Sequence, residues 1–204
     1  TTNIYAQKEI KPKLSKIESL FKKGELIEAK EISDVSISYE KTMDNPKTWY
    51  LRGLIYMALD TSASMVGVTN DALKTSISSF IKSDALIEDK SNELFIADDY
   101  GYPTTKTQQI ESYWGFYYNK AATAFGEKDF VEAITSFNNA ALIKPNDTNS
   151  VINAGYAAVQ AKMYDQAKNS FYKAIELGST DKDVRLILIY VVSTEQKLLE
   201  ESLE

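Results

Sequence analysis

The chain has 204 residues, 44% of them hydrophobic, and only 8 glycines and 4 prolines, a composition typical of a folded globular protein. Acidic residues outnumber basic ones by 29 to 23, a net charge of −6, which predicts no nucleic-acid partner and no attraction to anionic membranes. Cysteine and histidine are absent, so thiolate nucleophiles, imidazole bases, disulfides and the usual zinc ligands are excluded.

Residues 1–9 form a polar lead-in. Within it, Ile4-x-Ala6 fits the small-residue end of a signal-peptide cleavage site, and no initiator methionine precedes it. We expect residues 1–6 to be a signal-peptide remnant of a bacterial exported protein, which would be periplasmic or secreted. The alternative is a cytoplasmic protein whose given sequence begins at this point.

A first helical hairpin is predicted over residues 10–44. Its first helix ends at Lys22-Lys23-Gly24, and its apolar side chains recur every three or four positions, at Ile10, Leu14, Ile17, Leu20 and Phe21. Its second helix runs from Glu25 to about Tyr39. Both helices are amphipathic, so they are expected to pack against each other.

A second hairpin is predicted over residues 45–88. Asn45-Pro46 supplies an N-cap and a first-turn proline. In the motif Trp49-x2-Arg52-Gly53-x2-Tyr56, Gly53 is expected to let the partner helix approach closely. Residues 60–69 enlarge the tip of this hairpin and end at an expected Asn70 cap, after which Ser76-x3-Phe80-x2-Ser83 marks the second helix.

An insertion occupies residues 89–112. Its centre, Asp98 to Pro103, is rich in turn-forming residues, and loops of this length are usually functional or mobile. The acidic residues Glu88, Glu93 and Asp98-Asp99 lack the fixed spacing of a calcium loop. We therefore interpret them as a solvated acidic loop and expect no metal site.

Residues 113–147 and 148–181 contain one pattern twice. The segments 130–140 and 164–174 share an aromatic-x2-Ala-x3-Phe-x2-Ala skeleton, and Ala133 and Ala167 are 34 residues apart (167 − 133). A fixed period of this length indicates stacked helical hairpins. The first of these hairpins opens with a helix expected from Gln108 to about Phe125.

The last predicted helix lies within residues 182–204 and begins at a capping box, Thr180-x2-Asp183. Its outer face is expected to be polar, as in a helix that closes a repeat array, because of Glu195, Gln196, Lys197, Glu200 and Glu201. The apolar run from Val184 to Val192 contains Arg185 and is far shorter than the roughly 20 residues of a membrane span. No membrane insertion is therefore predicted.

These motifs resemble the tetratricopeptide repeat (TPR), a helix–turn–helix unit of 34 residues with an A-x3-F core. Pro145 matches the closing proline of the family in the first copy, and Arg52 stands where the family has leucine. The resemblance implies an all-α fold, a right-handed α-solenoid of TPR-like helix–turn–helix repeats with a C-terminal capping helix. We expect these repeats to form a single domain over residues 10–204.

The resemblance also implies a concave groove lined by the first helix of each hairpin. The positions that point into it, one and five residues after the Trp-equivalent position or one turn further, are Tyr50, Leu54, Met57, Tyr118, Ala122, Phe125, Ile152, Tyr156, Leu186 and Tyr190. Asn119 and Asn153 fall where the family's asparagines bind the backbone of an extended peptide. The alternative is that the tyrosines pack against neighbouring helices, the insertion or the last helix.

We therefore expect a non-catalytic interaction module that binds a protein or peptide and needs no cofactor. The expected groove has no lysine or arginine cluster, which argues against an acidic C-terminal tail as its ligand. Ser79-x2-Lys82 is a literal Ser-x-x-Lys motif, but it lies on an amphipathic repeat helix and does not indicate an enzyme. The alternative function is structural: self-association through exposed tips into a homo-oligomer, or support of an envelope assembly, with the groove filled intramolecularly.

Overall fold

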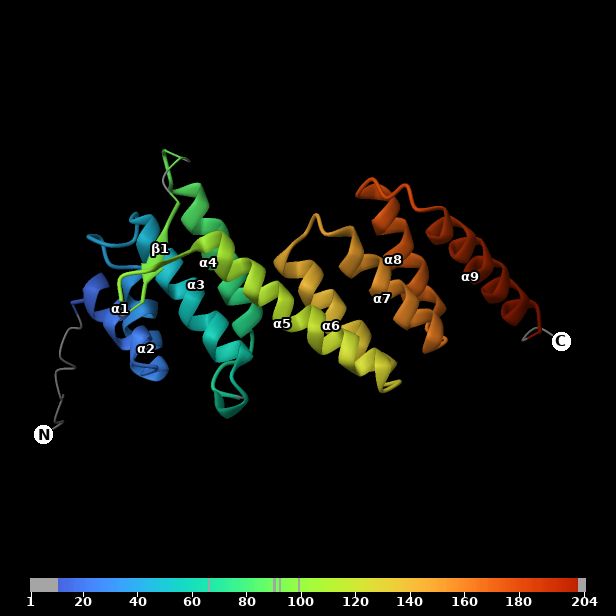
Figure 1. Ribbon diagram of the computed structural model, residues 1–204, viewed down its shortest axis with the longest axis horizontal. Helices are drawn as coiled ribbons and strands as arrows, with labels where there is room; N and C mark the ends of the chain where they lie inside the picture. The colour runs from blue at the N-terminus through green and yellow to red at the C-terminus, as the bar shows by residue number, and fades with distance from the viewer. Residues whose placement is uncertain (1–10, 66, 90, 92, 99, 202–204) are drawn as a thin grey trace, which may run out of the picture. The chain divides into compact units, whose positions relative to one another are not determined.

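The structure is a computed structural model that describes residues 11–65, 67–89, 91, 93–98 and 100–201 (Figure 1). The predicted signal-peptide remnant lies outside the described residues. The described residues form α-helices, one short 3-10 helix and one small sheet. In chain order these are α1 (Leu14–Lys22), α2 (Leu26–Ser36), α3 (Pro46–Thr61), η1 (Ala63–Met65), α4 (Ala72–Ala85), β1 (Phe95–Ala97), β2 (Pro103–Thr105), α5 (Lys106–Gly126), α6 (Phe130–Ile143), α7 (Thr148–Gln160), α8 (Tyr164–Glu176) and α9 (Lys182–Glu201).

The chain packs as two compact units, Thr1–Gln109 and Ile110–Glu204. The first contains α1 to α4 and the sheet, and the second contains α6 to α9 and most of α5. The predicted helical hairpins are confirmed within each unit. The single domain over residues 10–204, the right-handed superhelix and the capping role of α9 stay predictions.

The turns between paired helices share one hydrogen-bonding pattern. Gly24, Lys128 and Lys162 have φ angles of +74°, +64° and +58°, the left-handed conformation that commonly ends a helix. After each of them, the next backbone N–H donates back across the turn, as Asp129 N does to Ala124 O at 2.8 Å and Met163 N to Ala158 O at 2.8 Å. The 34-residue period therefore extends to the backbone of the turns.

Close approach at glycine is confirmed in both units. A β-carbon added to Gly53 on α3 would lie 2.5 Å from the ring of Phe80 on α4, and one added to Gly155 on α7 would lie 2.7 Å from the ring of Phe171 on α8. Atoms of a real side chain do not approach a ring this closely, so each glycine makes room for the phenylalanine of the next helix. The rings of Phe80 and Phe171 are buried in these contacts.

Arg52, the residue that departs from the family pattern, joins three helices of the first unit. Its Nε donates to Asp34 Oδ1 on α2 at 3.0 Å, and its Nη1 donates to Ser79 Oγ on α4 at 2.9 Å. Tyr56 Oη donates to the same carboxylate at 2.9 Å, and the Arg52 guanidinium lies 4.6 Å from the centre of the Tyr56 ring. An arginine therefore replaces the apolar leucine contact with a polar one between α2, α3 and α4.

The two departures from regular repeats have structure of their own. The enlarged tip at residues 60–69 contains η1, and α4 begins after Asp71 as its N-cap residue, so the expected Asn70 cap is wrong. In the 89–112 insertion, β1 and β2 pair antiparallel with Ile96 opposite Thr104, a hairpin that no sequence pattern predicts. At its turn, Asp98 Oδ1 accepts from the backbone N–H groups of Tyr100 and Tyr102, both at 2.9 Å.

The second unit holds one continuous core between α5 and α9. The repeated small and aromatic residues meet there with little or no exposure, as predicted, and Ala121 takes the place that Gly155 has in the next repeat. The helix α9 packs against α8 through Val184, Leu188 and Val191. Its N-cap differs from the expected capping box, because the Asp181 carboxylate accepts from Asp183 N at 2.9 Å.

Candidate functional site

A groove in the second unit is the best candidate for a functional site. It has a volume of about 410 Å³ and is formed by side chains from three helices, α5, α6 and α7. Its lining residues are Tyr118, Ala122, Phe125, Phe137, Asn153, Tyr156 and Gln160. No lining residue carries a charge at neutral pH, so the groove presents aromatic surface with a few amide and phenol groups.

Tyr118 is held at the groove from several sides. Its ring lies 4.8 Å from that of Trp114, one turn earlier on α5, and 5.3 Å from that of Phe137 on α6, in an edge-on arrangement. Its hydroxyl accepts a hydrogen bond of 2.7 Å from Asn153 Nδ2 on α7. A side chain fixed by two rings and a hydrogen bond is already ordered before a ligand binds, which lowers the entropy cost of binding.

Trp114 in turn ties α5 to the start of α7. Its Nε1 lies 3.0 Å from both Asp147 Oδ2 and Ser150 Oγ, and Asp147 is the N-cap of α7. The ammonium of Lys144 lies 4.7 Å from the centre of the Trp114 ring. This cluster fixes the spacing between the two helices that carry Tyr118 and Asn153.

Tyr156 forms the other aromatic side of the groove. Its ring packs edge-on against Phe171 at 5.6 Å, and the side chain is half-buried. Partial burial, and then the carboxylates of Asp181 and Asp183 just before and within α9, raise the pKa of the Tyr156 phenol. The phenol is therefore a neutral hydrogen-bonding group at physiological pH.

The structure brings together four of the predicted site residues, Tyr118, Phe125, Asn153 and Tyr156, and places Ala122 beside them. Two lining residues are outside the predicted set. The repeat pattern assigns Phe137 to the core only, and Gln160 lies one turn after Tyr156, a spacing that would have identified it.

Two predicted residues are wrong as exposed groove residues. Tyr50 and Leu54 are fully buried within the first unit. The Tyr50 ring lies 6.3 Å from that of Phe80, and burial, followed by the nearby carboxylates of Glu93 and Glu18, raises the pKa of its phenol. Tyr50 is therefore a core residue of the first unit and is not available to a ligand.

The remaining predicted residues lie apart from the groove lining. Ile152 is buried in the core of the second unit, and Met57 is half-buried on α3. Asn119 and Tyr190 are exposed, on α5 and α9 respectively. The burial of Ile152 contradicts its predicted exposure in the groove, whereas a role of Met57, Asn119 and Tyr190 in partner binding stays a prediction.

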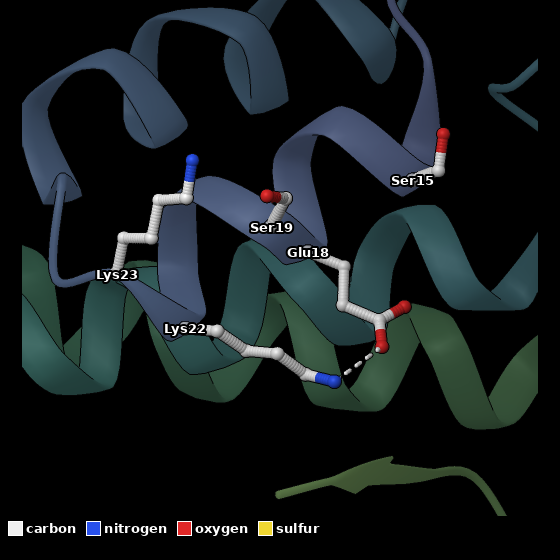
Figure 2. A pocket seen from close by; sticks show the side chains of 5 residues that line it. All are labelled: Ser15, Glu18, Ser19, Lys22 and Lys23. Atoms are coloured by element: carbon white, nitrogen blue, oxygen red, sulfur yellow. Dashed lines mark ion pairs between the residues drawn. The ribbon is translucent and has the colours of Figure 1, made fainter. Parts of the chain in front are cut away.

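A second depression, of about 420 Å³, lies along α1 in the first unit and is lined by Ser15, Glu18, Ser19, Lys22 and Lys23. Figure 2 shows the Glu18 and Lys22 side chains pointing toward each other while Lys23 points away from them. Glu18 pairs with Lys22 at 3.4 Å and with Lys47 at 2.7 Å, and despite partial burial these lysines lower the pKa of its carboxyl. Glu18 and Lys22 are thus already paired within the unit, unlike the charges of an open ligand site.

Across the described residues, no group of three or more acidic side chains is arranged to hold a metal ion. The same residues include no helix with the length and apolarity needed to cross a membrane.

Comparison with known proteins identifies one repeat. Residues 149–178 match the family model of the tetratricopeptide repeat, and no curated protein matches the chain. A solved structure of a "MamA RS-1 ArsTM double mutant" is 14% identical, with a TM-score of 0.38 over 89% of this chain and 83% of that one. A chain of the "APC/C hetero-tetramer Cut9-Hcn1" is 17% identical, with a TM-score of 0.37 over 88% of this chain and 42% of that one. Both likenesses are too weak to bear on function.

Proposed function

We propose that this chain, a tetratricopeptide-repeat protein, is a non-catalytic module that binds an extended segment of a partner protein in the groove of its second unit. Tetratricopeptide repeats are in general protein-interaction modules. The observation that carries the proposal is the meeting of Tyr118, Phe125, Asn153 and Tyr156 around one open groove of about 410 Å³. Aromatic side chains at such a site bury a large area at a small entropic cost.

The lining supports an uncharged, partly apolar segment as the ligand. The half-buried rings of Tyr118, Phe125 and Tyr156 favour apolar or aromatic side chains, and no lysine or arginine lines the groove to attract an acidic tail. Asn153 Nδ2 is already bonded to Tyr118 Oη. This bond uses one of the two amide hydrogens, and we expect the Asn153 amide oxygen to accept a hydrogen bond from the backbone N–H of a bound peptide.

The Ala122→Arg substitution tests this proposal, because it places a large side chain in the groove without removing a packing contact. Wild-type protein selects peptides from a random library, and the dissociation constant of a selected peptide is measured by fluorescence anisotropy for wild type and for Ala122→Arg. Ala122 is exposed on α5 and lines the groove, so an arginine there is tolerated by the helix but occupies the binding space. We expect binding to weaken about 30-fold or more, the effect of losing one hot spot.

Thr123→Arg is the matched control. Thr123 is the next residue on α5, is exposed and does not line the groove. The two variants share the added charge and the helix, so only the face differs. Thr123→Arg should bind the peptide as wild type does, and an Ala122→Arg variant that also binds like wild type would contradict the proposal.

A further inference from the structure

The outer face of α9 carries apolar side chains that no described residue covers. The inner face of the helix holds Val184 and Val191, which are fully buried against the rest of the unit. On the opposite side, Leu186, Ile189 and Tyr190 have exposed fractions of 63%, 64% and 56%. Leu186 and Tyr190 are two of the positions predicted to face the groove, and the polar residues predicted on the outer face, such as Lys197 and Glu200, lie further along α9 and are exposed.

These side chains form a continuous stripe. Leu186, Ile189, Tyr190 and Ser193 follow one another at steps of three, one and three residues, which places them on one side of a helix. Ile81, whose exposure is similar, is the only exposed large apolar residue among the described residues of α4. The apolar part of this stripe, from Leu186 to Tyr190, covers a little more than one turn of the helix, and a cluster of exposed apolar side chains is typical of a surface that is covered by a partner.

A further repeat helix packed in the family's manner does not fit this stripe. Ile189 occupies the position of Gly155 in the preceding repeat (189 − 155 = 34), where even one added β-carbon would lie 2.7 Å from the Phe171 ring. The much larger isoleucine prevents a helix from docking on α9 as α8 docks on α7. The partner must therefore lie further out and meet the ends of the side chains, as one helix does when it packs on another through side-chain ridges.

The charges that flank the stripe fit a second α9 running in the opposite direction. Lys182 lies nine residues before position 191 and Glu200 nine residues after it (191 − 182 = 200 − 191), and both are exposed. Two α9 helices can run antiparallel and cross at residue 191. Each Lys182 then lies beside the other copy's Glu200, and each Ile189 lies beside the other copy's Ser193. A parallel pair would place Lys182 against Lys182.

We infer that two copies of this chain associate through the outer faces of α9, in an antiparallel pair with two-fold symmetry. Leu186, Ile189 and Tyr190 form its apolar centre, and Lys182 and Glu200 fix the direction. The contact is isologous, because the same surface serves on both copies. It differs from the predicted self-association through hairpin tips, and it does not depend on peptide binding in the groove.

Sedimentation velocity of the full chain over protein concentrations from about 10 µM to about 1 mM tests the association, a range suited to an interface of small area. Wild type should show a reversible monomer–dimer equilibrium, and Ile189→Glu should remain monomeric. Ile81→Glu is the matched control, since Ile81 is equally exposed at 63% but lies on α4. A monomeric wild type throughout this range, or a dimer that Ile189→Glu leaves unchanged, would overturn the inference.

Charge exchange tests the direction of the pair. Lys182→Glu and Glu200→Lys should each raise the dimer dissociation constant, by about fivefold, because the symmetry places two like-charged contacts in every dimer. The double variant restores opposite charges and should return to the wild-type constant. If the double variant stays as weak as the single ones, the antiparallel arrangement is incorrect.

Discussion

At the scale of single residues, Arg52 departs from the repeat pattern and makes polar contacts that a leucine could not make. A leucine at this position would contribute only apolar contact, whereas the guanidinium reaches Asp34 and Ser79 on two neighbouring helices. Asp34 also accepts from Lys30 Nζ at 2.9 Å and from Tyr56 Oη. Because this half-buried carboxylate has three partners, the loss of any one of them leaves the others in place.

Tyr56→Phe measures the contribution of this cluster. Removing the hydroxyl should lower the free energy of unfolding of the first unit by about 1–2 kcal/mol at pH 7, the usual effect of a hydrogen bond to a charged group. Urea unfolding followed by circular dichroism gives this value. Tyr172→Phe, at an exposed position on α8, is the control and should leave the unfolding curve unchanged.

The difference in unfolding free energy between wild type and Tyr56→Phe should depend on pH. Burial, followed by the hydrogen bond to Asp34, raises the pKa of Tyr56 above its ordinary value of 10.0. A raised folded-state pKa gives stability that is complete below the unfolded-state pKa and is lost as the pH rises through the folded-state value. The difference in unfolding free energy between wild type and Tyr56→Phe should therefore shrink above pH 10, and a constant difference from pH 7 to about pH 11 would count against the assigned hydrogen bond.

At the scale of elements, the helix pairs depend on glycine where a ring from the next helix approaches. Gly155→Ala places a β-carbon against Phe171 and should lower the free energy of unfolding by about 1–3 kcal/mol, as overpacking does. Gly115→Ala is the matched control, because Gly115 is also helical and has no atom within 4 Å of an added β-carbon. That change should stabilise α5 by about 0.5–1 kcal/mol, and equal effects of the two variants in urea unfolding would contradict the packing described.

The sequence predicts the elements whose pattern is repeated and misses those whose pattern is not. The skeleton around Ala133 and Ala167 predicts α6 and α8, because its apolar residues recur at the three- and four-residue spacing of one helix face. The strands β1 and β2 have three residues each, too few to show an alternating pattern. The N-cap of α4 is Asp71 and not the predicted Asn70. Asparagine and aspartate both favour the N-cap position, so the sequence does not distinguish these two neighbours.

At the scale of the whole molecule, equivalent repeat positions differ in exposure between the two units. Tyr50 and Tyr118 both follow a Trp-equivalent position by one residue, yet Tyr50 is fully buried and Tyr118 lines a groove. The sequence places both on the same face of a repeat helix. No local sequence pattern distinguishes them, because the burial of Tyr50 depends on the tertiary packing of the first unit, including its contact with Phe80 on α4.

A methyl NMR titration tests the groove most directly. The protein is labelled at its alanine methyl groups and titrated with a peptide selected by wild type from a random library. We predict a saturable shift at Ala122, within the groove, and no shift at Ala85, an exposed residue at the end of α4 in the first unit. Saturable binding that leaves Ala122 unmoved would contradict the proposal that the groove of α5, α6 and α7 is the binding site.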